Sequence, residues 1–225
     1  MNYRSIAIDG PAGAGKSTLA RQLAGKLGYL YVDTGAIYRT VALAVLRAGA
    51  DPAGPGRVVP LLEGLDIRMG YGEDGVQRMY LAGEDVSAAI REHQISGVAS
   101  RVSAIPEVRA FLLDLQRKLA RENDVVMDGR DIGTVVLPGA DVKIFLTAAP
   151  EARAERRLLE LEQRGQTADF ETVLRDIKDR DYSDEHRPIA PLKRAEDAAL
   201  LDTTNLNLEQ SLEALLSLVK EKIAQ

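Results

Sequence analysis

The chain has 225 residues, a formal net charge of −5 and no cysteine. This length suits a single α/β domain with small insertions. The acidic balance disfavours a general attraction to nucleic acid, and the lack of cysteine excludes disulfide scaffolds and thiolate metal sites. No apolar run approaches the length that crosses a bilayer, and the first residues lead directly into a predicted strand, so we expect no signal peptide and a cytoplasmic protein.

A glycine-rich loop joins the first predicted strand, Ile6 to Asp9, to a helical pattern from Leu19 to Leu27. The loop reads Gly10-Pro11-Ala12-Gly13-Ala14-Gly15-Lys16-Ser17-Thr18 and matches the phosphate-binding pattern G-x-x-x-x-G-K-[ST]. Its glycines allow a tight turn with inward N–H groups, and the next helix N-terminus favours phosphate oxygens. Lys16 adds a charge for the β and γ phosphates, and Ser17 offers a hydroxyl to magnesium. The loop predicts a nucleoside triphosphate with magnesium and leaves the acceptor open.

The second predicted strand covers residues 29 to 32 and is followed by a helix from Ala36 to Arg47. Strands that alternate with helices predict a parallel sheet with helices on both faces and ligands at the carboxyl ends of the strands. Thr34, Tyr38 and Arg39 lie at one such end. They are therefore candidate binding residues, although a solvated helix position explains Arg39 equally well.

An insertion interrupts this alternation. Residues 49 to 56 are rich in glycine and proline and predict a linker or the start of an insertion. Residues 65–69 and 76–81 alternate with a period near two around a glycine-containing turn, which predicts a β-hairpin, with 83–86 as a candidate third strand. We interpret this piece as a small subdomain that acts as a moving cover or binding arm.

Two helices are predicted next, from Glu92 to Ala104 and from Pro106 to Arg121. The proline suits the first position of a helix. Ser100 and Arg109 lie on these helices, and by themselves they are more typical of surface positions than of a site.

The next buried strand, residues 125 to 128, ends in Asp128. A carboxylate in this position is typical of a residue that holds magnesium through water, and Asp33 is the second candidate for that role. The strand leads into Gly129-Arg130-Asp131-Ile132-Gly133-Thr134. Two charged residues between glycines at a strand's carboxyl end favour a binding site over a structural turn.

A basic stretch follows. Arg153, Arg156 and Arg157 have i, i+3, i+4 spacing and share one helix face, as Arg180, Asp184 and Arg187 can do further on. Together with the glycine loop, the first group favours a mobile arginine-bearing lid over a solvated face balanced by glutamates. The remaining predicted elements are strands at 142–146 and 199–202 and an amphipathic closing helix at 207–223.

The number of cations favours two anionic substrates. Two unit charges about 4 Å apart repel by roughly 4 kcal/mol at an effective dielectric near 20, so several cations must face the transferring group. No histidine or lone carboxylate is evident as a general base. A phosphate monoester needs none because it is already a dianion near neutral pH. The acceptor is therefore expected to be a phosphate.

Three stretches together resemble bacterial cytidylate kinases, which are P-loop nucleoside monophosphate kinases. They are Asp-Thr-Gly-Ala-Ile-Tyr-Arg at 33–39, Gly-Arg-Asp-Ile-Gly-Thr at 129–134, and Arg-Asp-x-x-Asp-x-x-Arg ending at Arg187. The resemblance spans nearly the whole chain. It implies an α/β parallel-sheet P-loop NTPase core with an inserted antiparallel NMP-binding subdomain and a short helical lid. The expected boundaries are core 1–34, 105–150 and 188–225, NMP-binding subdomain 35–104 and lid 151–187.

The resemblance also implies the reaction ATP + CMP or dCMP giving ADP + CDP or dCDP, with magnesium, in pyrimidine nucleotide metabolism. Cytosine would be recognised by Ser100, Arg109 and Asp131. The acceptor phosphate would be met by Arg39, Arg130 and Arg187, with Thr34, Tyr38, Arg180 and Asp184 nearby. Catalytic charge would come from Lys16, Arg130, Arg153, Arg157 and Arg187. The apolar pattern shows no long exposed stripe, so we expect a monomer.

Two alternatives remain open from the sequence. One is a P-loop kinase for another small acceptor, such as UMP or a metabolite hydroxyl. The other is a nucleotide-binding switch that hydrolyses slowly and signals through the hairpin arm. Nucleic-acid binding is disfavoured by the acidic charge and the few aromatic residues.

Overall fold

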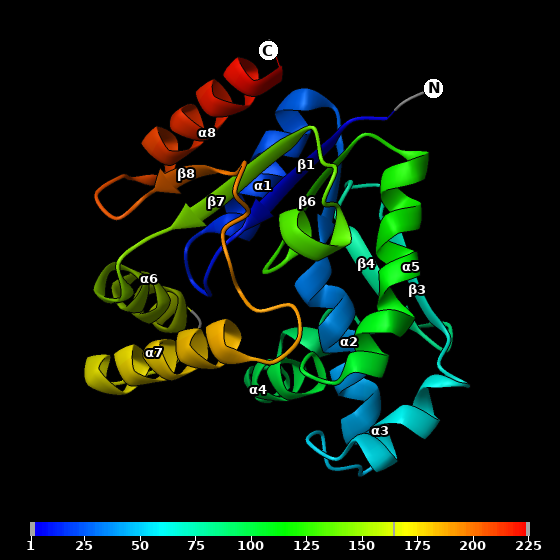
Figure 1. Cartoon of the computed structure of the whole chain (residues 1–225). Coiled ribbons are helices and arrows are strands. Elements are labelled where there is room, and N and C mark those ends of the chain that lie inside the picture. The colour runs from blue at the N-terminus through cyan, green and yellow to red at the C-terminus, as the bar shows by residue number, and fades with distance from the viewer. Residues whose placement is uncertain (1–2, 164, 224–225) are drawn as a thin grey trace. The chain divides into compact units, whose positions relative to one another are not determined.

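A computed structural model describes residues 3–163 and 165–223 (Figure 1). The chain forms two compact units: Met1–Tyr31 together with Glu122–Gln225, and Val32–Arg121. The first unit contains the glycine loop and the arginine-rich stretches, and the second contains the inserted hairpin.

The first unit is built on a sheet with the strand order β2-β6-β1-β7-β8. Its strands are β1 (Ser5–Asp9), β2 (Leu30–Asp33, of which Leu30 and Tyr31 belong to this unit), β6 (Val125–Gly129), β7 (Val142–Thr147) and β8 (Ala199–Asp202). β1 pairs in parallel with β6 and β7, so that Asp9 lies beside Gly129 and Phe145. The predicted parallel sheet is confirmed. The glycine loop and the 129–134 segment therefore leave neighbouring strands at the same edge.

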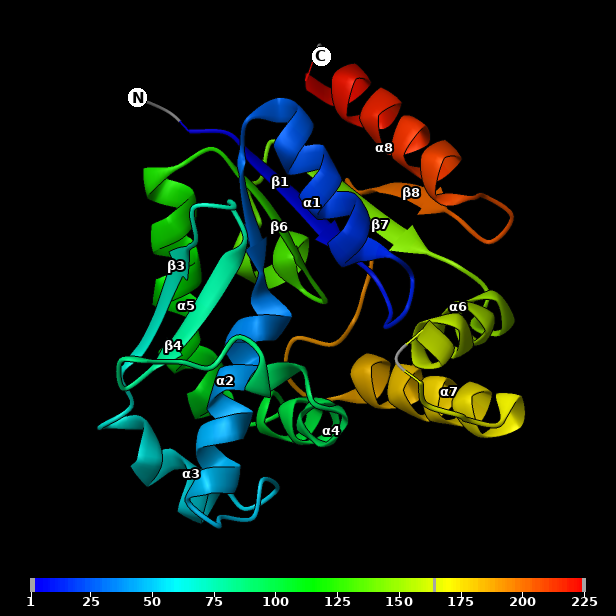
Figure 2. The same ribbon diagram turned by 180° about the vertical axis from the view of Figure 1, so that it is seen from behind.

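Helices α1 (Lys16–Leu27) and α8 (Leu208–Ile223) supply the apolar side chains that cover the sheet. Figure 2 shows α1 crossing in front of β1. The shared core cluster includes Leu19 and Leu23 of α1, Leu215 and Val219 of α8, and Ile6 and Ile144 of the strands. Each such side chain contributes about 1.5–3 kcal/mol when fully buried. The strands are apolar in continuous runs, as is typical of a parallel sheet.

Helices α6 (Pro150–Gln163) and α7 (Phe170–His186) form a hairpin with a core of its own, which both views show as two helices side by side (Figures 1 and 2). Ala154 and Leu161 of α6 pack with Val173, Leu174 and Ile177 of α7. The predicted helix through the basic stretch is confirmed.

The second unit combines helices with a separate antiparallel sheet of order β3-β4-β5. Its elements are α2 (Thr34–Arg47), α3 (Pro55–Leu62), β3 (Ile67–Tyr71), β4 (Gln77–Leu81), β5 (Glu84–Asp85), a 3₁₀ turn (Ala89–Arg91), α4 (His93–Val102) and α5 (Pro106–Glu122). The predicted hairpin, third strand and two helices are confirmed. Helix α3 was missed, because the sequence predicted only a linker up to residue 56. Within residues 3–163 and 165–223, no helix combines the length and apolar character needed to cross a membrane.

Candidate active site

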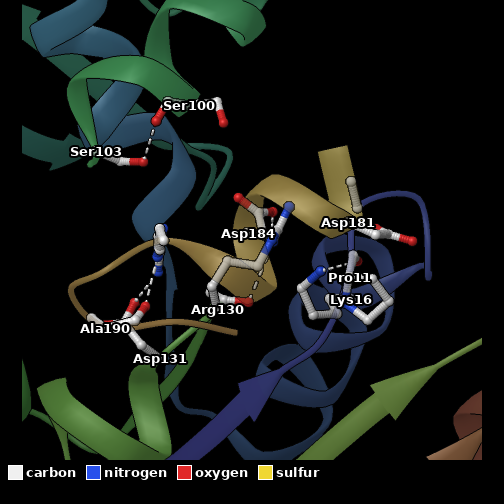
Figure 3. Close-up of polar contacts among 12 residues, drawn as sticks. Pro11, Lys16, Ser100, Ser103, Arg130, Asp131, Asp181, Asp184 and Ala190 are labelled. Carbon is white, nitrogen blue, oxygen red and sulfur yellow. Dashed lines mark hydrogen bonds and ion pairs between the residues drawn. The ribbon is translucent and has the colours of Figure 1, made fainter. Parts of the chain in front are cut away.

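The glycine loop connects β1 to α1 as predicted, and Lys16 is the first residue of that helix. The Lys16 Nζ donates a hydrogen bond to the Pro11 carbonyl oxygen at 2.7 Å (Figure 3). Burial, followed by the positive charge of Arg130, lowers the pKa of Lys16 to about 7. A phosphate against this amine would oppose both effects by favouring the charged form. The loop is thus suited to an anion.

Ser17 and Asp128 meet at the start of α1. The Ser17 hydroxyl donates to Asp128 Oδ2 at 2.8 Å, and the Tyr31 hydroxyl donates to Asp128 Oδ1 at 3.0 Å. Tyr31 was not among the predicted site residues. A hydroxyl and one carboxylate, completed by substrate phosphates, are oxygen ligands of the kind that magnesium takes. The residues present therefore fit the predicted ion.

Asp33, the second candidate for magnesium, is the cap residue directly before α2 in the second unit. Its Oδ1 accepts from the Ala36 N–H at 2.9 Å and its Oδ2 accepts from Arg39 Nη2 at 2.9 Å. Such a side chain satisfies an otherwise unpaired N–H at a helix start. Thr34 is the buried first residue of α2. Asp33 thereby links the start of the helix to the guanidinium of Arg39.

The structure connects Tyr38, Ser100 and Arg109 within the second unit. The Arg109 guanidinium carbon lies 5.6 Å from the centroid of the Tyr38 ring, a cation–π contact. Arg109 Nη1 donates to the Ser103 carbonyl oxygen at 3.2 Å, and the Ser103 hydroxyl donates to the Ser100 carbonyl oxygen at 2.8 Å (Figure 3). Ser103 was not predicted.

In the first unit, Arg130 leaves β6 and pairs with Asp184 of α7. Arg130 Nε donates to Asp184 Oδ2 at 2.9 Å (Figure 3). Burial opposes ionisation of Asp184, but the charges of Arg130 and Arg180 prevail and hold the pKa of this carboxyl below its usual value. The positive charge of Arg180 also acts on Lys16. The charges of both arginines therefore act on the carboxylate and on the glycine-loop lysine.

Asp131 and Arg187 lie together in the same unit. Arg187 Nη2 is 3.4 Å from Asp131 Oδ1, and Arg187 Nε donates to the Ala190 carbonyl oxygen at 2.6 Å (Figure 3). Asp131 is only 4% exposed. A π-helical turn, Ile132–Val136, follows it directly, a conformation often found at functional sites.

Arg153 is the most enclosed of the predicted lid arginines, with 3% of its surface exposed. Its Nε donates to the Ala148 carbonyl oxygen at 2.8 Å, and its Nη1 donates to the Ala12 carbonyl oxygen at 3.0 Å. The same Nη1 lies 3.0 Å from Asp181 Oδ1. Asp181 was not predicted, although it lies between Arg180 and Asp184 in the sequence. Arg153 therefore links the glycine loop to both α6 and α7.

The other two arginines of that stretch have different partners. Arg156 Nη2 donates to the Thr203 carbonyl oxygen at 2.6 Å. Arg157 is partly exposed and pairs with Glu160 at 3.0 Å. Arg153, Arg156 and Arg157 therefore bind different partners and do not form one cluster.

Asp9 is a buried acid that was not among the predicted site residues. Its Oδ1 accepts from the Ile132 N–H and its Oδ2 from the Gly133 N–H, each at 2.7 Å. Burial raises the pKa of Asp9 to about 6, although both N–H groups oppose the rise. The signal was an acid that ends a buried strand, the same signal that identified Asp128. Asp9 holds the segment that carries Asp131.

An Asp9→Asn variant should remove one component of the pH dependence of stability. The pKa of Asp9 is 3.8 in the unfolded chain and about 6 in the folded protein. Between these two pH values, Asp9 is deprotonated in the unfolded chain but still protonated in the folded protein. Wild-type stability therefore falls as the pH rises through this window. Relative to the variant, wild type should lose about 2 kcal/mol of unfolding free energy between pH 4.5 and 7.5. Urea denaturation of both proteins tests this, and a pH-independent difference would contradict it.

The whole chain was compared with known protein families and with individual relatives. Residues 6–221 match the family model described as cytidylate kinase. The chain is 50% identical over 218 residues to cytidylate kinase of Caldicellulosiruptor bescii, covering 97% of this chain and 96% of the relative. It is 46% identical over 222 residues to cytidylate kinase of Streptococcus agalactiae, covering 99% and 96%.

A solved structure of an uncharacterized protein from Eubacterium ventriosum is similar in fold. Its TM-score is 0.51 at 13% identity, with 99% of each chain covered. This likeness concerns the fold alone. The sequence matches extend over nearly the whole length and agree with the three motifs named above. This protein therefore belongs to the cytidylate kinase family.

Proposed function

We propose that this protein transfers the γ-phosphoryl group of ATP to CMP and dCMP. The observation that carries the proposal is that Lys16 and a pair of arginines, Arg130 and Arg180, influence one another electrostatically in the first unit. Lys16 belongs to the loop for the donor, and the charges of Arg130 and Arg180 reach it. Arg130 also pairs with Asp184 at 2.9 Å, and the charge of Arg180 acts on the same carboxyl. Adjacent cation groups of this kind suit a reaction in which donor and acceptor are both phosphates.

In the proposed reaction, an oxygen of the acceptor phosphate forms a bond to the γ phosphorus of ATP. The bond from that phosphorus to the β–γ bridging oxygen breaks, and ADP leaves with the electron pair. Residues 10–18 would bind the ATP phosphates. Lys16, Arg130, Arg153, Arg157 and Arg187 would stabilise the charge of the transferring group. A general base is unnecessary, because the acceptor is already a dianion.

We propose that Ser17 and Asp128 hold magnesium, Asp128 through water. Asp128 is favoured over Asp33 because it already binds the Ser17 hydroxyl, the other proposed ligand, whereas Asp33 pairs with the Arg39 guanidinium and caps α2. When bound, magnesium would neutralise charge on the β and γ phosphates.

Cytosine recognition is proposed for Asp131, Ser100 and Arg109. A carboxylate accepts from the exocyclic amine of cytosine, and an arginine donates to the ring acceptors. Uracil presents a carbonyl oxygen where cytosine has the amine, so Asp131 would face an acceptor. The acceptor phosphate and sugar would contact Thr34, Tyr38, Arg39, Arg130, Arg180, Asp184 and Arg187.

The same proposal assigns roles to the parts of the chain. Residues 35–104 would bind the monophosphate, residues 151–187 would form the lid, and the remaining residues would form the core. We propose a cytoplasmic monomer that acts in pyrimidine nucleotide metabolism.

ADP release from Mg-ATP should be stimulated by CMP and dCMP. The kcat/KM for these acceptors should exceed that for UMP by at least about tenfold, because a site built for an amine rejects a base that lacks it. AMP and GMP complete the panel of acceptors. A reaction without acceptor is the control. Equal turnover of UMP would keep the kinase and reject the base-reading role of Asp131. No stimulation by any acceptor would instead favour the nucleotide switch.

A further inference from the structure

The side chain of Gln77 binds the main chain of Asp33 at two points, both within the second unit. Gln77 Oε1 accepts from the Asp33 N–H at 2.8 Å, and Gln77 Nε2 donates to the Asp33 carbonyl oxygen at 3.2 Å. Gln77 Nε2 also lies 3.3 Å from the Met79 sulfur. A carboxamide can do this because it carries both a donor and an acceptor. It thus binds the main chain of Asp33 as both donor and acceptor.

The position of Gln77 is fixed by the antiparallel sheet. It is the first residue of β4, lies opposite Tyr71 in the register with β3, and is 7% exposed. Buried backbone groups cost free energy when they lose their partner. This one buried side chain therefore binds both the N–H and the carbonyl of Asp33.

Asp33 passes this restraint on to Arg39. The backbone of Asp33 is extended, with φ −80° and ψ 96°, and its carboxylate caps α2 and pairs with Arg39. The space there is tight, since a Cβ added to Gly35 would lie 3.0 Å from Arg39 Nη1 and 3.1 Å from Asp33 Oδ1. A rotation of the Asp33 peptide would therefore move both the helix cap and the guanidinium.

We propose that Gln77 is a positioning residue of the acceptor site: it fixes Asp33 and, through it, the Arg39 guanidinium that receives the acceptor phosphate. This rests on the proposed function, in which Arg39 contacts CMP. Under this proposal, the inserted antiparallel sheet positions the start of α2 through Gln77. Gln77 itself would not touch the substrate.

The test compares Gln77→Met, which removes both hydrogen bonds, with Gln77→Glu, which keeps only the acceptor for the Asp33 N–H. We expect Gln77→Met to raise the KM for CMP about tenfold, with the KM for ATP changed less than about twofold. Gln77→Glu should raise the KM for CMP as well, because its carboxylate would face the Asp33 carbonyl. It also provides the readout if Gln77→Met does not fold.

Gln116 offers a matched control in the same unit. It is 1% exposed on α5, and its Nε2 has no hydrogen-bond partner among the described residues. Gln116→Met should leave the KM for CMP unchanged. In an Arg39→Ala background, moreover, Gln77→Met should no longer raise the KM for CMP, because its route to the substrate is gone.

Three results would overturn the inference while the proposed function stands. The first is a wild-type KM for CMP in both Gln77 variants. The second is a rise in the KM for ATP equal to that for CMP. The third is an undiminished effect of Gln77→Met in the Arg39→Ala background. Failure of wild type to phosphorylate CMP would instead reject the proposed function, which the acceptor panel measures separately.

Discussion

Lys16→Met is expected to lower kcat for CMP phosphorylation by about 10²–10³-fold, the usual cost of removing one preorganised group that stabilises transition-state charge. The methionine side chain has a similar length and no charge. Lys16 is buried and its amine is held against the Pro11 carbonyl of the glycine loop. The charge is therefore already placed where the loop would receive the β and γ phosphates.

The fold should tolerate this change. Burial and the nearby charge of Arg130 both disfavour the protonated amine, as its lowered pKa shows, and the variant removes that charge. Steady-state kinetics and circular dichroism on the same samples separate activity from folding. Lys26→Met, an exposed position in the last turn of the same helix, is the matched control and should retain wild-type kcat. Activity within tenfold of wild type in Lys16→Met would contradict the role given to Lys16.

Much of the fold could be predicted because its signals are local. The glycine loop, the apolar strands and the acids at the ends of several strands are contiguous in the sequence, and a parallel sheet brings the strand ends to one edge. The hairpin followed from alternation on both sides of a glycine-containing turn. Helix α3 was missed because Gly54 and Gly56 read as a linker, although Pro55 between them suits the first position of a helix.

The partners of the site residues could not be predicted in the same way. Gln77 reaches Asp33 only because the register of β3 with β4 directs it there, and no local pattern encodes that register. Charge spacing likewise correctly predicted a helix through Arg153. It could not show that this arginine binds the carbonyl of Ala12, which is 141 positions away in the chain. Such contacts depend on packing between distant segments.

Gly10→Ala should destabilise the protein by about 4–5 kcal/mol, a loss reached only when a substitution forces the backbone apart. Gly10 has φ +150°, and a Cβ at this position would lie 1.9 Å from the carbonyl oxygen and 2.9 Å from the carbonyl carbon of Leu146. Leu146 belongs to β7, the direct neighbour of β1 in the sheet. Both clashing atoms are backbone, so no side-chain rotation relieves the contact.

Relief of this clash would move the first residue of the glycine loop away from β7, so phosphate binding should be lost together with stability. Thermal unfolding should show a midpoint lowered by roughly 10–15 °C for a chain of this size. Gly25→Ala is the matched control, because no atom lies within 4 Å of its added Cβ and it lies inside α1. That change should leave stability equal or raise it by about 0.5–1 kcal/mol, since alanine favours a helix over glycine. A Gly10→Ala protein as stable as Gly25→Ala would show that β1 and β7 can separate without cost, and the close strand approach would then not explain the glycine.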